Sequence, residues 1–456
     1  EAMENMLTRM KSGSNRTAGG NRLSNQVLDY INNSTGVTMF FNTRSALLQT
    51  ISAANFVNWS FNNPLMAGKA FANQPQYWKD FTKLMNSDYL KDRRNGLKLN
   101  INESEIADAA KTSKNKAKAA LNYILEKGYL PTKFADSFAI ASGGAMFYRN
   151  RINDLVKKGM SVKEAEAQAM KEFRQVSEKS QQSSDPSKIS MQQSGDLGRI
   201  ILQYANTPMQ YARIQKRAIQ DIANGRGDMK ANLSKVIYYG FLQNLMFNAL
   251  QQGAFALGFG DDFSDEDKDK KTIDTVNGML DSSLRGLGLG GVTLQVLKNL
   301  GLDIYKRSAR KRPEYTDAYY KLLEFSPSIK SKLSRFKSAA YPFDSKKRRA
   351  EVFDKGFSLD NPAYESMAKV ITAVSNVPLD RMYSKINNLK DATADNIDTW
   401  QSIANVLGWP TWQLEPKKKK KSTNSSSTKN KLEWDPSTMS FKDSSDSDLF
   451  SESDFK

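Results

Sequence analysis

The sequence lacks both cysteine and histidine in all of its 456 residues. The absence of cysteine excludes disulfides, thiolate nucleophiles and thiolate metal sites. The absence of histidine excludes serine–histidine triads, histidine general bases and the usual zinc sites. Enzymatic chemistry would have to depend on carboxylates, lysine, tyrosine or serine. We therefore expect a protein that is not an enzyme, with no catalytic, cofactor-binding or metal-ligating residues.

The missing cysteine also has a mechanical consequence. A chain that cannot be cross-linked can be unfolded and threaded through a pore. The sequence begins at Glu1 rather than Met, and Glu1–Asn32 has no basic region followed by an apolar core, so it does not have the pattern of a signal peptide. We interpret the chain as a fragment that is cut from a longer precursor.

Apolar residues are scarce and positive charge is in excess. Hydrophobic residues make up 39% of the chain, and 67 Lys and Arg against 49 Asp and Glu give a net charge of +18. A basic surplus of this size favours nucleic acid, an anionic membrane surface or an acidic protein as partner. The composition does not choose among these three.

Strand patterns with hairpin turns are nearly absent, whereas helix signals recur. Ser161-Val-Lys-Glu164 is a capping box, and Ala165, Ala169, Phe173 and Val176 follow at helical spacing. Asn361-Pro362 forms a second helix start, after which Met367, Val370, Ile371 and Val374 share one face. We predict an all-α fold, an elongated or multi-unit helical bundle.

Changes in composition predict four segments. Residues 1–35 are a polar N-terminal segment, and the helical units 36–227 and 228–416 follow, the second with a central charge-free helix. Past Pro416 the chain carries seven lysines and no acid over residues 417–431, and then acids dispersed among serines. Such a composition cannot bury enough apolar surface to order itself, so residues 417–456 are predicted to be a disordered, charged tail.

Two short motifs match catalytic or nucleotide-binding patterns only in their letters. Gly286–Gly291 reads GLGLGG, but a dinucleotide site needs a preceding strand, and the residues before it have a helical pattern. We interpret it as a link between two helices. Ser334–Lys337 has the spacing SxxK, which a chain of this length contains at chance level.

Asp265, Asp267 and Asp269 have the spacing of a calcium-binding loop. Lys270 stands where that loop needs glycine, and Val276 stands where it needs glutamate. We therefore expect no calcium site here, and we interpret Asp261–Lys271 as a solvated loop.

Val236–Gly260 (VIYYGFLQNLMFNALQQGAFALGFG) holds 25 residues without a charge. Its length suits a bilayer span, but five amide side chains within it would be costly in hydrocarbon. Ser45–Gly68 has the same character and is broken by Pro64. We interpret both as interior helices whose amides pair within a bundle, apolar enough to contact a membrane if they are unpacked.

Basic residues cluster in three places: Ile304–Arg312, Lys346–Arg349 and the tail from Lys417. Such clusters bind phosphates by counterion release, but the tail lacks the interleaved aromatic residues that stack on bases. Affinity for DNA that falls steeply between about 50 and 200 mM salt would favour a nucleic-acid partner.

Four strings together resemble a known family: Phe56–Phe81, Gln181–Tyr211, Phe325–Ala339 and Val377–Pro416. They resemble the C-terminal portion of the large polyvalent virion proteins of tailed bacteriophages, most closely those of crAss-like phages. The resemblance covers about residues 35–416. It implies a component or internal cargo of the virion that is cleaved from a precursor, packaged in the capsid or tail, and delivered into the host with the genome.

We therefore expect a non-enzymatic virion cargo protein without cofactors, metal or a small-molecule substrate. Its expected partners are other virion proteins of the portal, tail or capsid, in multiple copies, with phage DNA and transient contact with the host membrane as further partners. After ejection we expect it in the host envelope or cytoplasm. The alternatives are an internal nucleic-acid-binding protein that escorts or condenses the genome, and a permanent component of the tail or portal region.

Overall fold

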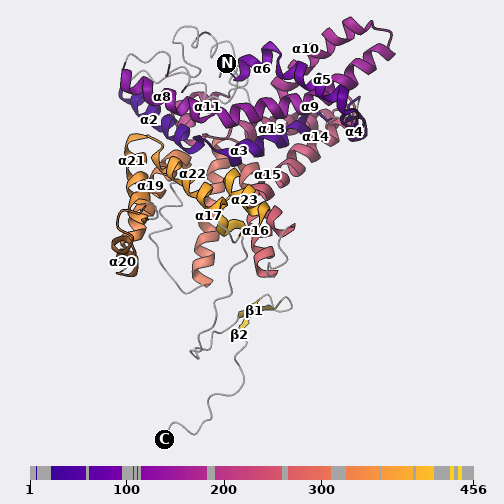
Figure 1. The fold of residues 1–456 in the computed structure, drawn as a ribbon. Helices are drawn as coiled ribbons and strands as arrows, with labels where there is room; N and C mark the ends of the chain where they lie inside the picture. The colour runs from indigo at the N-terminus through magenta and orange to yellow at the C-terminus, as the bar shows by residue number, and fades with distance from the viewer. Residues whose placement is uncertain are drawn as a thin grey trace. The chain divides into compact units, whose positions relative to one another are not determined.

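The computed structural model describes residues 7, 22–57, 61–94, 106, 110, 115–181, 190–258, 265–309, 325–344, 346–358, 361–393, 397–414, 432–435 and 440–443 (Figure 1). Contacts divide the chain into one compact unit, Glu1–Pro416, and a second, Lys417–Lys456. The division falls where the composition changes. Helices of 36–227 and of 228–416 pack against one another within the first unit.

Every regular element in the described part of residues 1–416 is a helix, so the predicted all-α class is confirmed. Residues 22–223 form α2 (Arg22–Met39), α3 (Thr43–Gln49), η1 (Thr50–Phe56), α4 (Pro64–Ala72), α5 (Gln74–Met85), α6 (Asp88–Arg94), α8 (Lys116–Gly128), α9 (Leu130–Lys157), α10 (Val162–Ser180), α11 (Met191–Ser194), α12 (Asp196–Ile201) and α13 (Asn206–Ala223).

The helices of the following residues are α14 (Met229–Ile237), η3 (Tyr238–Leu242), α15 (Gln243–Gln251), η4 (Ala254–Gly258), α16 (Asp265–Gly286), α17 (Leu289–Ala309), α19 (Pro327–Ala340), η6 (Tyr341–Phe343), α20 (Lys346–Asp354), α21 (Pro362–Ser375), α22 (Leu379–Ala392), α23 (Thr399–Leu407) and α24 (Thr411–Leu414). Among these, η3 is a single π-helical turn between two α-helices.

Of the predicted tail, the described residues form two short strands, β1 (Leu432–Asp435) and β2 (Ser440–Asp443). The strands pair antiparallel, with Leu432 opposite Asp443. The composition of the tail does not predict this pair of strands. The rest of the tail lies outside the described residues, as does most of the N-terminal segment 1–35.

The predicted helix starts are confirmed. The Ser161 hydroxyl accepts a bond from the Glu164 backbone N–H, and the Glu164 carboxylate accepts one from the Ser161 N–H. At α21 the Asn361 side chain caps the Ala363 N–H at 2.9 Å. These side chains satisfy backbone donors that the first turn of a helix leaves without a partner.

The apolar face of α21 is present, but it faces outward. Met367, Val370, Ile371 and Val374 are between 39% and 60% exposed. The helix instead buries Ser366, Thr372 and Ala373, and it packs against α19 and α22. Small side chains let helices approach closely, so the packing of α21 follows the size of its residues more than their hydrophobicity.

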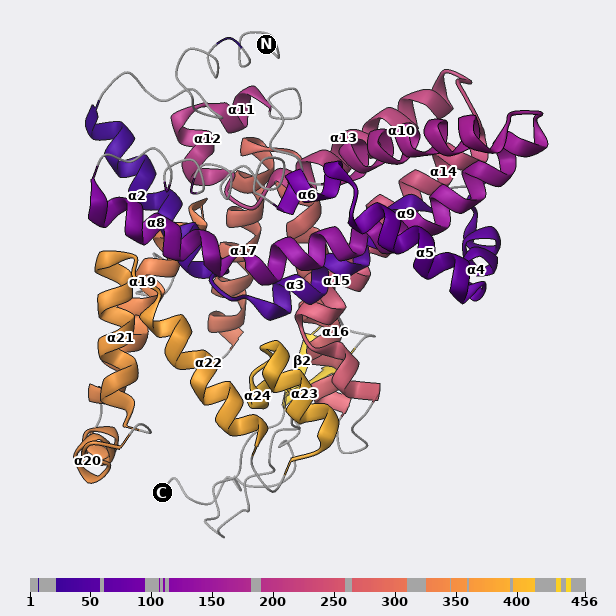
Figure 2. The same ribbon diagram turned by 45° about the horizontal axis from the view of Figure 1, so that its top comes forward.

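The 28-residue helix α9 organises the larger part of the described core. It packs against η1, α3, α4, α5, α6, α8 and α10, and Figure 2 shows α10 lying along it. Four clusters of buried apolar residues exist in the described part of the chain, and the largest surrounds α9. In it, the Phe173 ring of α10 stacks on Phe56 of η1 with centroids 5.7 Å apart.

Two glycines let α9 be approached closely. A Cβ atom at Gly143 would lie 2.1 Å from the Ala53 carbonyl oxygen, and one at Gly144 would lie 2.3 Å from the Phe173 ring. Neither position has room for a side chain. The position of η1 on α9 therefore depends on Gly143, where the obstacle is backbone and cannot rotate away.

We predict opposite effects for two glycine-to-alanine substitutions. Gly143→Ala should lower the free energy of unfolding by about 1–3 kcal/mol, because η1 must shift away from α9. Gly301→Ala, on the exposed side of α17 with nothing within 4 Å of the new Cβ, should raise it by about 0.5–1 kcal/mol through helix propensity. Urea unfolding followed by circular dichroism measures both. Equal effects of the two substitutions would contradict the close packing at Gly143.

Candidate functional site: a polar cavity with a cationic end

The charge-free stretch Val236–Gly260 buries two of its amides and exposes several of its large apolar residues. Gln243 and Asn248 are buried, whereas Phe241 is 54% exposed. The Gln243 side-chain N–H donates to the Tyr211 hydroxyl at 2.6 Å, and the Ser282 hydroxyl donates to the Asn244 side-chain oxygen at 2.9 Å. The predicted pairing of the amides is confirmed, but the prediction of a wholly interior helix is wrong.

The second charge-free stretch, Ser45–Gly68, is not one helix. It contains the end of α3, then η1, and the first half of α4. None of the helices in the described part of the chain is both long and apolar enough to cross a membrane.

The inward amides line a cavity of about 550 Å³. Its walls come from α3, η1, α9, α13, α15, α16 and α17, so both predicted helical units contribute to it. Amides and tyrosines dominate the lining, with Gln243, Asn244, Asn248 and Gln251 supplied by α15 alone. The lining thus offers hydrogen-bonding groups within a surface that is more apolar than polar.

The two carboxylates of the lining are neutralised by cations outside it. Asp136 of α9 accepts two bonds from Arg93, whose Nε lies 2.5 Å from Oδ2 and whose Nη2 lies 3.1 Å from Oδ1. Asp281 of α16 pairs with Lys298 at 2.8 Å. The two carboxylates therefore repel an anion in the cavity less than two unpaired carboxylates would.

Three buried polar atoms of the lining have no hydrogen-bond partner among the described residues: Ser52 Oγ, Thr132 Oγ1 and Gln243 Oε1. They come from η1, α9 and α15, on three sides of the cavity. A buried polar atom without a partner costs about 1–3 kcal/mol, so each of them favours a polar occupant.

Three cations lie near one another at and beyond the cavity wall, and of these Arg44 alone lines the cavity. The Arg44 guanidinium donates to the Gln413 amide oxygen at 3.1 Å, and the Lys385 ammonium donates to the Thr43 hydroxyl at 2.6 Å. A Cβ atom at Gly408 would lie 3.3 Å from Lys385 Nζ and 3.6 Å from Arg44 Cβ. Both side chains therefore lie beside the backbone at Gly408.

Arg381 of α22 completes this group, which we call the cationic end: Arg44, Arg381 and Lys385. Its Nε is buried and has no acceptor among the described residues. Burial lowers the pKa of Arg44, and the charge of Arg381 lowers it further. Burial and the charges of Arg381 and Arg44 lower the pKa of Lys385 in the same way. The three cations therefore lie close enough to destabilise one another.

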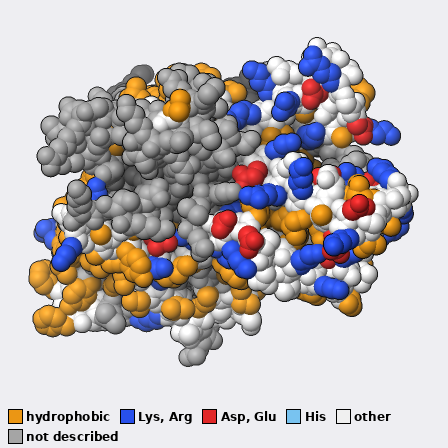
Figure 3. Space-filling model, turned by 90° about the horizontal axis from the view of Figure 1, so that it is seen from above, with side chains coloured by type: hydrophobic (Ala, Val, Ile, Leu, Met, Phe, Trp, Pro, Cys, Tyr) orange, Lys and Arg blue, Asp and Glu red, His pale blue; other side chains and the backbone are white. Residues whose placement is uncertain are grey.

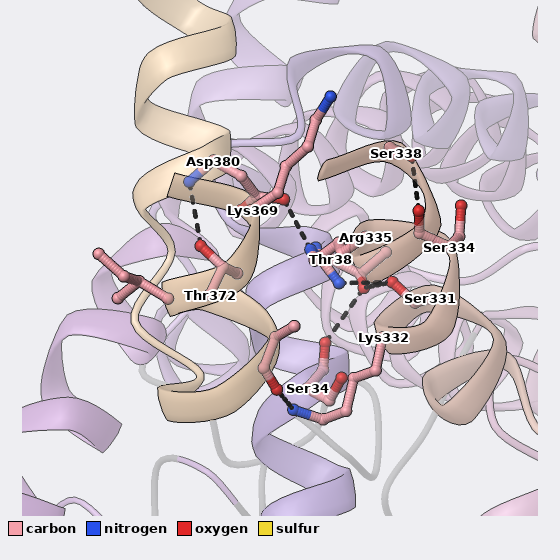
Figure 4. A network of polar contacts seen from close by, with 12 residues as sticks. Ser34, Thr38, Ser331, Lys332, Ser334, Arg335, Ser338, Lys369, Thr372 and Asp380 are labelled. Atoms are coloured by element: carbon pink, nitrogen blue, oxygen red, sulfur yellow. Dashed lines mark hydrogen bonds and ion pairs between the residues drawn. The ribbon is translucent and has the colours of Figure 1, made fainter. Parts of the chain in front are cut away.

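Asp380, an acid whose charge acts on Arg381, belongs to a hydrogen-bond network (Figure 4). Its carboxylate accepts from Arg335 Nε at 2.6 Å, and Arg335 also donates to the Ser331 hydroxyl. Next to it, the Lys332 ammonium donates to the Ala373 carbonyl at 2.7 Å and to the Asn376 side chain at 2.6 Å. One oxygen of Asp380, Oδ2, is thus engaged by Arg335, whereas the buried Oδ1 has no partner among the described residues.

None of the motifs singled out in the sequence supplies one of the three cations. Gly286 ends α16 and Leu289 begins α17, so GLGLGG is a link between helices, as predicted. The aspartates 265, 267 and 269 belong to α16, because that helix begins at Asp265; the predicted loop is wrong from that residue onward. No group of three or more Asp or Glu in the described residues could hold a metal ion.

The basic clusters are described only in part. Lys346 and Arg349 are exposed on α20, whereas most of Ile304–Arg312 and the lysines of the tail lie outside the residues whose side chains are described. Ser334 and Lys337, the ends of the SxxK string, lie on α19. No sequence motif marks Arg44, Arg381 or Lys385. The signal for the cavity in the sequence is the set of five amides in the charge-free stretch Val236–Gly260, four of which line the cavity.

Comparisons with known protein families, with characterised proteins and with solved structures found no match.

We predict that Lys332 makes stability depend on pH. Burial and the charge of Arg335 lower the pKa of Lys332 to about 8 in the folded protein, from 10.5. Between these values the unfolded chain binds more protons than the folded protein, so stability rises with pH. The free energy of unfolding of the wild type minus that of Lys332→Met should increase from pH 8 to pH 10. A difference that is constant across this range would contradict the lowered pKa.

Proposed function

We propose that this chain is a non-enzymatic subunit of a bacteriophage virion, a processed cargo protein that is stored in the capsid or tail and ejected into the host with the genome. The resemblance of its four strings to polyvalent virion proteins motivates the proposal. The observation that supports it best is the set of apolar helix faces that the described chain leaves exposed.

The clearest such face runs along α14 and η3. Met229, Leu233, Ile237 and Phe241 recur every four residues and are all exposed. We call these four residues the outer stripe. Residues four apart lie on one side of a helix, so together they form a continuous apolar surface. The four apolar residues of α21 form a second surface of this kind, and Figure 3 shows hydrophobic side chains gathered over part of the described surface.

Contiguous apolar surfaces of this kind mark protein or membrane contacts. Other virion proteins, or further copies of this chain, would cover them in an assembled particle. The outer stripe spans twelve residue steps, about 18 Å along a helix, which is shorter than the hydrocarbon core of a bilayer. Contact with the host membrane would therefore be made at its interface.

The packing of the protein interior supports an ejection route in which the chain unfolds and passes through the phage tail. The described apolar core is split into four clusters, and many buried positions hold amides and hydroxyls. A hydrogen bond contributes about 1 kcal/mol net, less than the burial of a large apolar side chain. With no cysteine to cross-link it, such a chain unfolds at modest cost and can be threaded.

The net charge of +18 and the exposed Lys346 and Arg349 favour the alternative of a protein that escorts DNA. Retention in emptied particles would instead favour a permanent component of the tail or portal region. Both alternatives share the virion location with the main proposal.

The decisive experiment is quantitative mass spectrometry of peptides from this chain in purified particles before and after genome release. We expect the peptides to be abundant in full particles and depleted from emptied ones. Unchanged abundance would overturn the cargo role in favour of a structural one. Absence from all particles would overturn the virion assignment.

We predict that the outer stripe is needed for packaging and not for folding. Phe241→Ser replaces an exposed residue, so it should change the free energy of unfolding by less than about 0.5 kcal/mol. It should nevertheless reduce incorporation into particles, because a partner loses an apolar contact. The matched control is Phe353→Ser, at an 82% exposed phenylalanine on α20. Equal incorporation of both variants would contradict a docking role for the stripe.

A further inference from the structure

The hairpin that α13 and α14 form leaves one side of α14 uncovered. The two helices lie side by side (Figure 2), and α13 also packs against η3 and α16, whereas α14 packs mainly against α13 and the turn η3 that follows it. The four residues of the outer stripe lie on the uncovered side and are between 47% and 68% exposed. In contrast, Asn232 of the same helix is buried. The stripe is therefore an apolar helix face without a partner in the described part of the chain.

The same hairpin carries an excess of positive charge. Residues 213–235 hold six Lys and Arg against two Asp. Four of these cations are exposed and form no ion pair with a described acid: Lys216, Arg217, Arg226 and Lys230. Charge that the protein itself does not neutralise attracts an anionic partner.

Two of the cations lie next to the outer stripe. Lys230 precedes Leu233 by three residues and Ile237 by seven, so it lies on the same side of α14 as the stripe. Arg226 lies in the connection before α14, three residues from Met229. A row of large apolar residues bordered by cations is typical of a helix that lies in the interface of a membrane. Its apolar side chains enter the acyl region, and its cations stay among the headgroups.

An anionic membrane fits this face better than the other partners of a basic protein. The backbone of a nucleic acid pairs with cations, but it offers no apolar surface to the stripe. An acidic protein would need an apolar groove shaped to the stripe and acids placed at Arg226 and Lys230. A bilayer interface supplies both environments along any helix that lies in it, and anionic headgroups complement the charge of the hairpin.

We propose that the α13–α14 hairpin binds the interface of an anionic membrane. The outer stripe enters the boundary between headgroups and acyl chains, and Arg226 and Lys230 bind lipid phosphates. This inference rests on the proposed function, because it names the surface that the stripe contacts once the chain has left the particle. It goes further by assigning the contact to one hairpin and to lipids of negative charge.

The test uses the purified full chain and two kinds of vesicle, phosphatidylcholine alone and phosphatidylcholine mixed with phosphatidylglycerol, with co-sedimentation as the measurement. We expect binding to the mixed vesicles that weakens as salt is added, and little binding to phosphatidylcholine alone. Replacing Arg226 and Lys230 together by Gln should weaken binding about 25-fold, since each cation near an anionic surface contributes about fivefold. Phe241→Ser should weaken it about tenfold through lost apolar burial.

The matched controls are Phe353→Ser and the paired replacement of Lys346 and Arg349 by Gln, all at exposed positions of α20. Both should leave vesicle binding unchanged. Circular dichroism checks that each variant is folded, and Leu233→Ser replaces Phe241→Ser if the latter is not.

Three outcomes would overturn the proposal. Equal losses in the α20 variants would show that the net charge of the whole chain is responsible. Equal binding to both kinds of vesicle would remove the role of Arg226 and Lys230. Absence of binding to the mixed vesicles would leave an acidic protein as the partner of this face. The experiment contains no particles, so each of these outcomes leaves the virion assignment to be decided by mass spectrometry of particles.

Discussion

The close approach of η1 to α9 at Gly143 is the contact on which most of the described structure depends. It places Phe56 beside Phe173 in the largest apolar cluster, and it places Ser52 on the wall of the cavity. The N-terminal part of α9 contributes Thr132 and Asp136 to that wall. A helix of 28 residues is about 42 Å long, so α9 alone positions residues of both the core and the cavity.

The distribution of polar and apolar side chains follows from packing size. Serine, threonine and alanine bring α21 against α19, and Gly143 brings η1 against α9. Large apolar residues are left on the outer sides of several helices, while amides occupy the interior around α15. A single chain in water gains little from this arrangement. It becomes favourable where other molecules cover the outer faces. The exposed faces and the amide-rich interior therefore both support the proposed role as a subunit of a larger assembly.

The sequence predicts the class of fold and several helix starts, because these depend on local chemistry: a capping box at Ser161 or an Asn-Pro step at Asn361 acts within one turn. It also predicts which residues of α21 share a face. It could not predict which face is buried, because that depends on the partner helix α19. The cationic end is invisible in the sequence, since Arg44 and Arg381 are brought together by tertiary folding alone. The cavity had a partial signal in the amides of Val236–Gly260, which indicated internal pairing but not an enclosed space.

The π-helical turn at Tyr238–Leu242 sets the rotational phase between α14 and α15. A π-turn takes up one residue more than an α-helical turn, and each residue corresponds to about 100° of rotation. If this turn tightened into regular α-helix, α15 would rotate by roughly that angle about its own axis. Gln243 and Asn248 would leave the interior, and another side of α15 would take their place. A change in this single backbone turn would therefore exchange the solvent-exposed and the buried faces of α15.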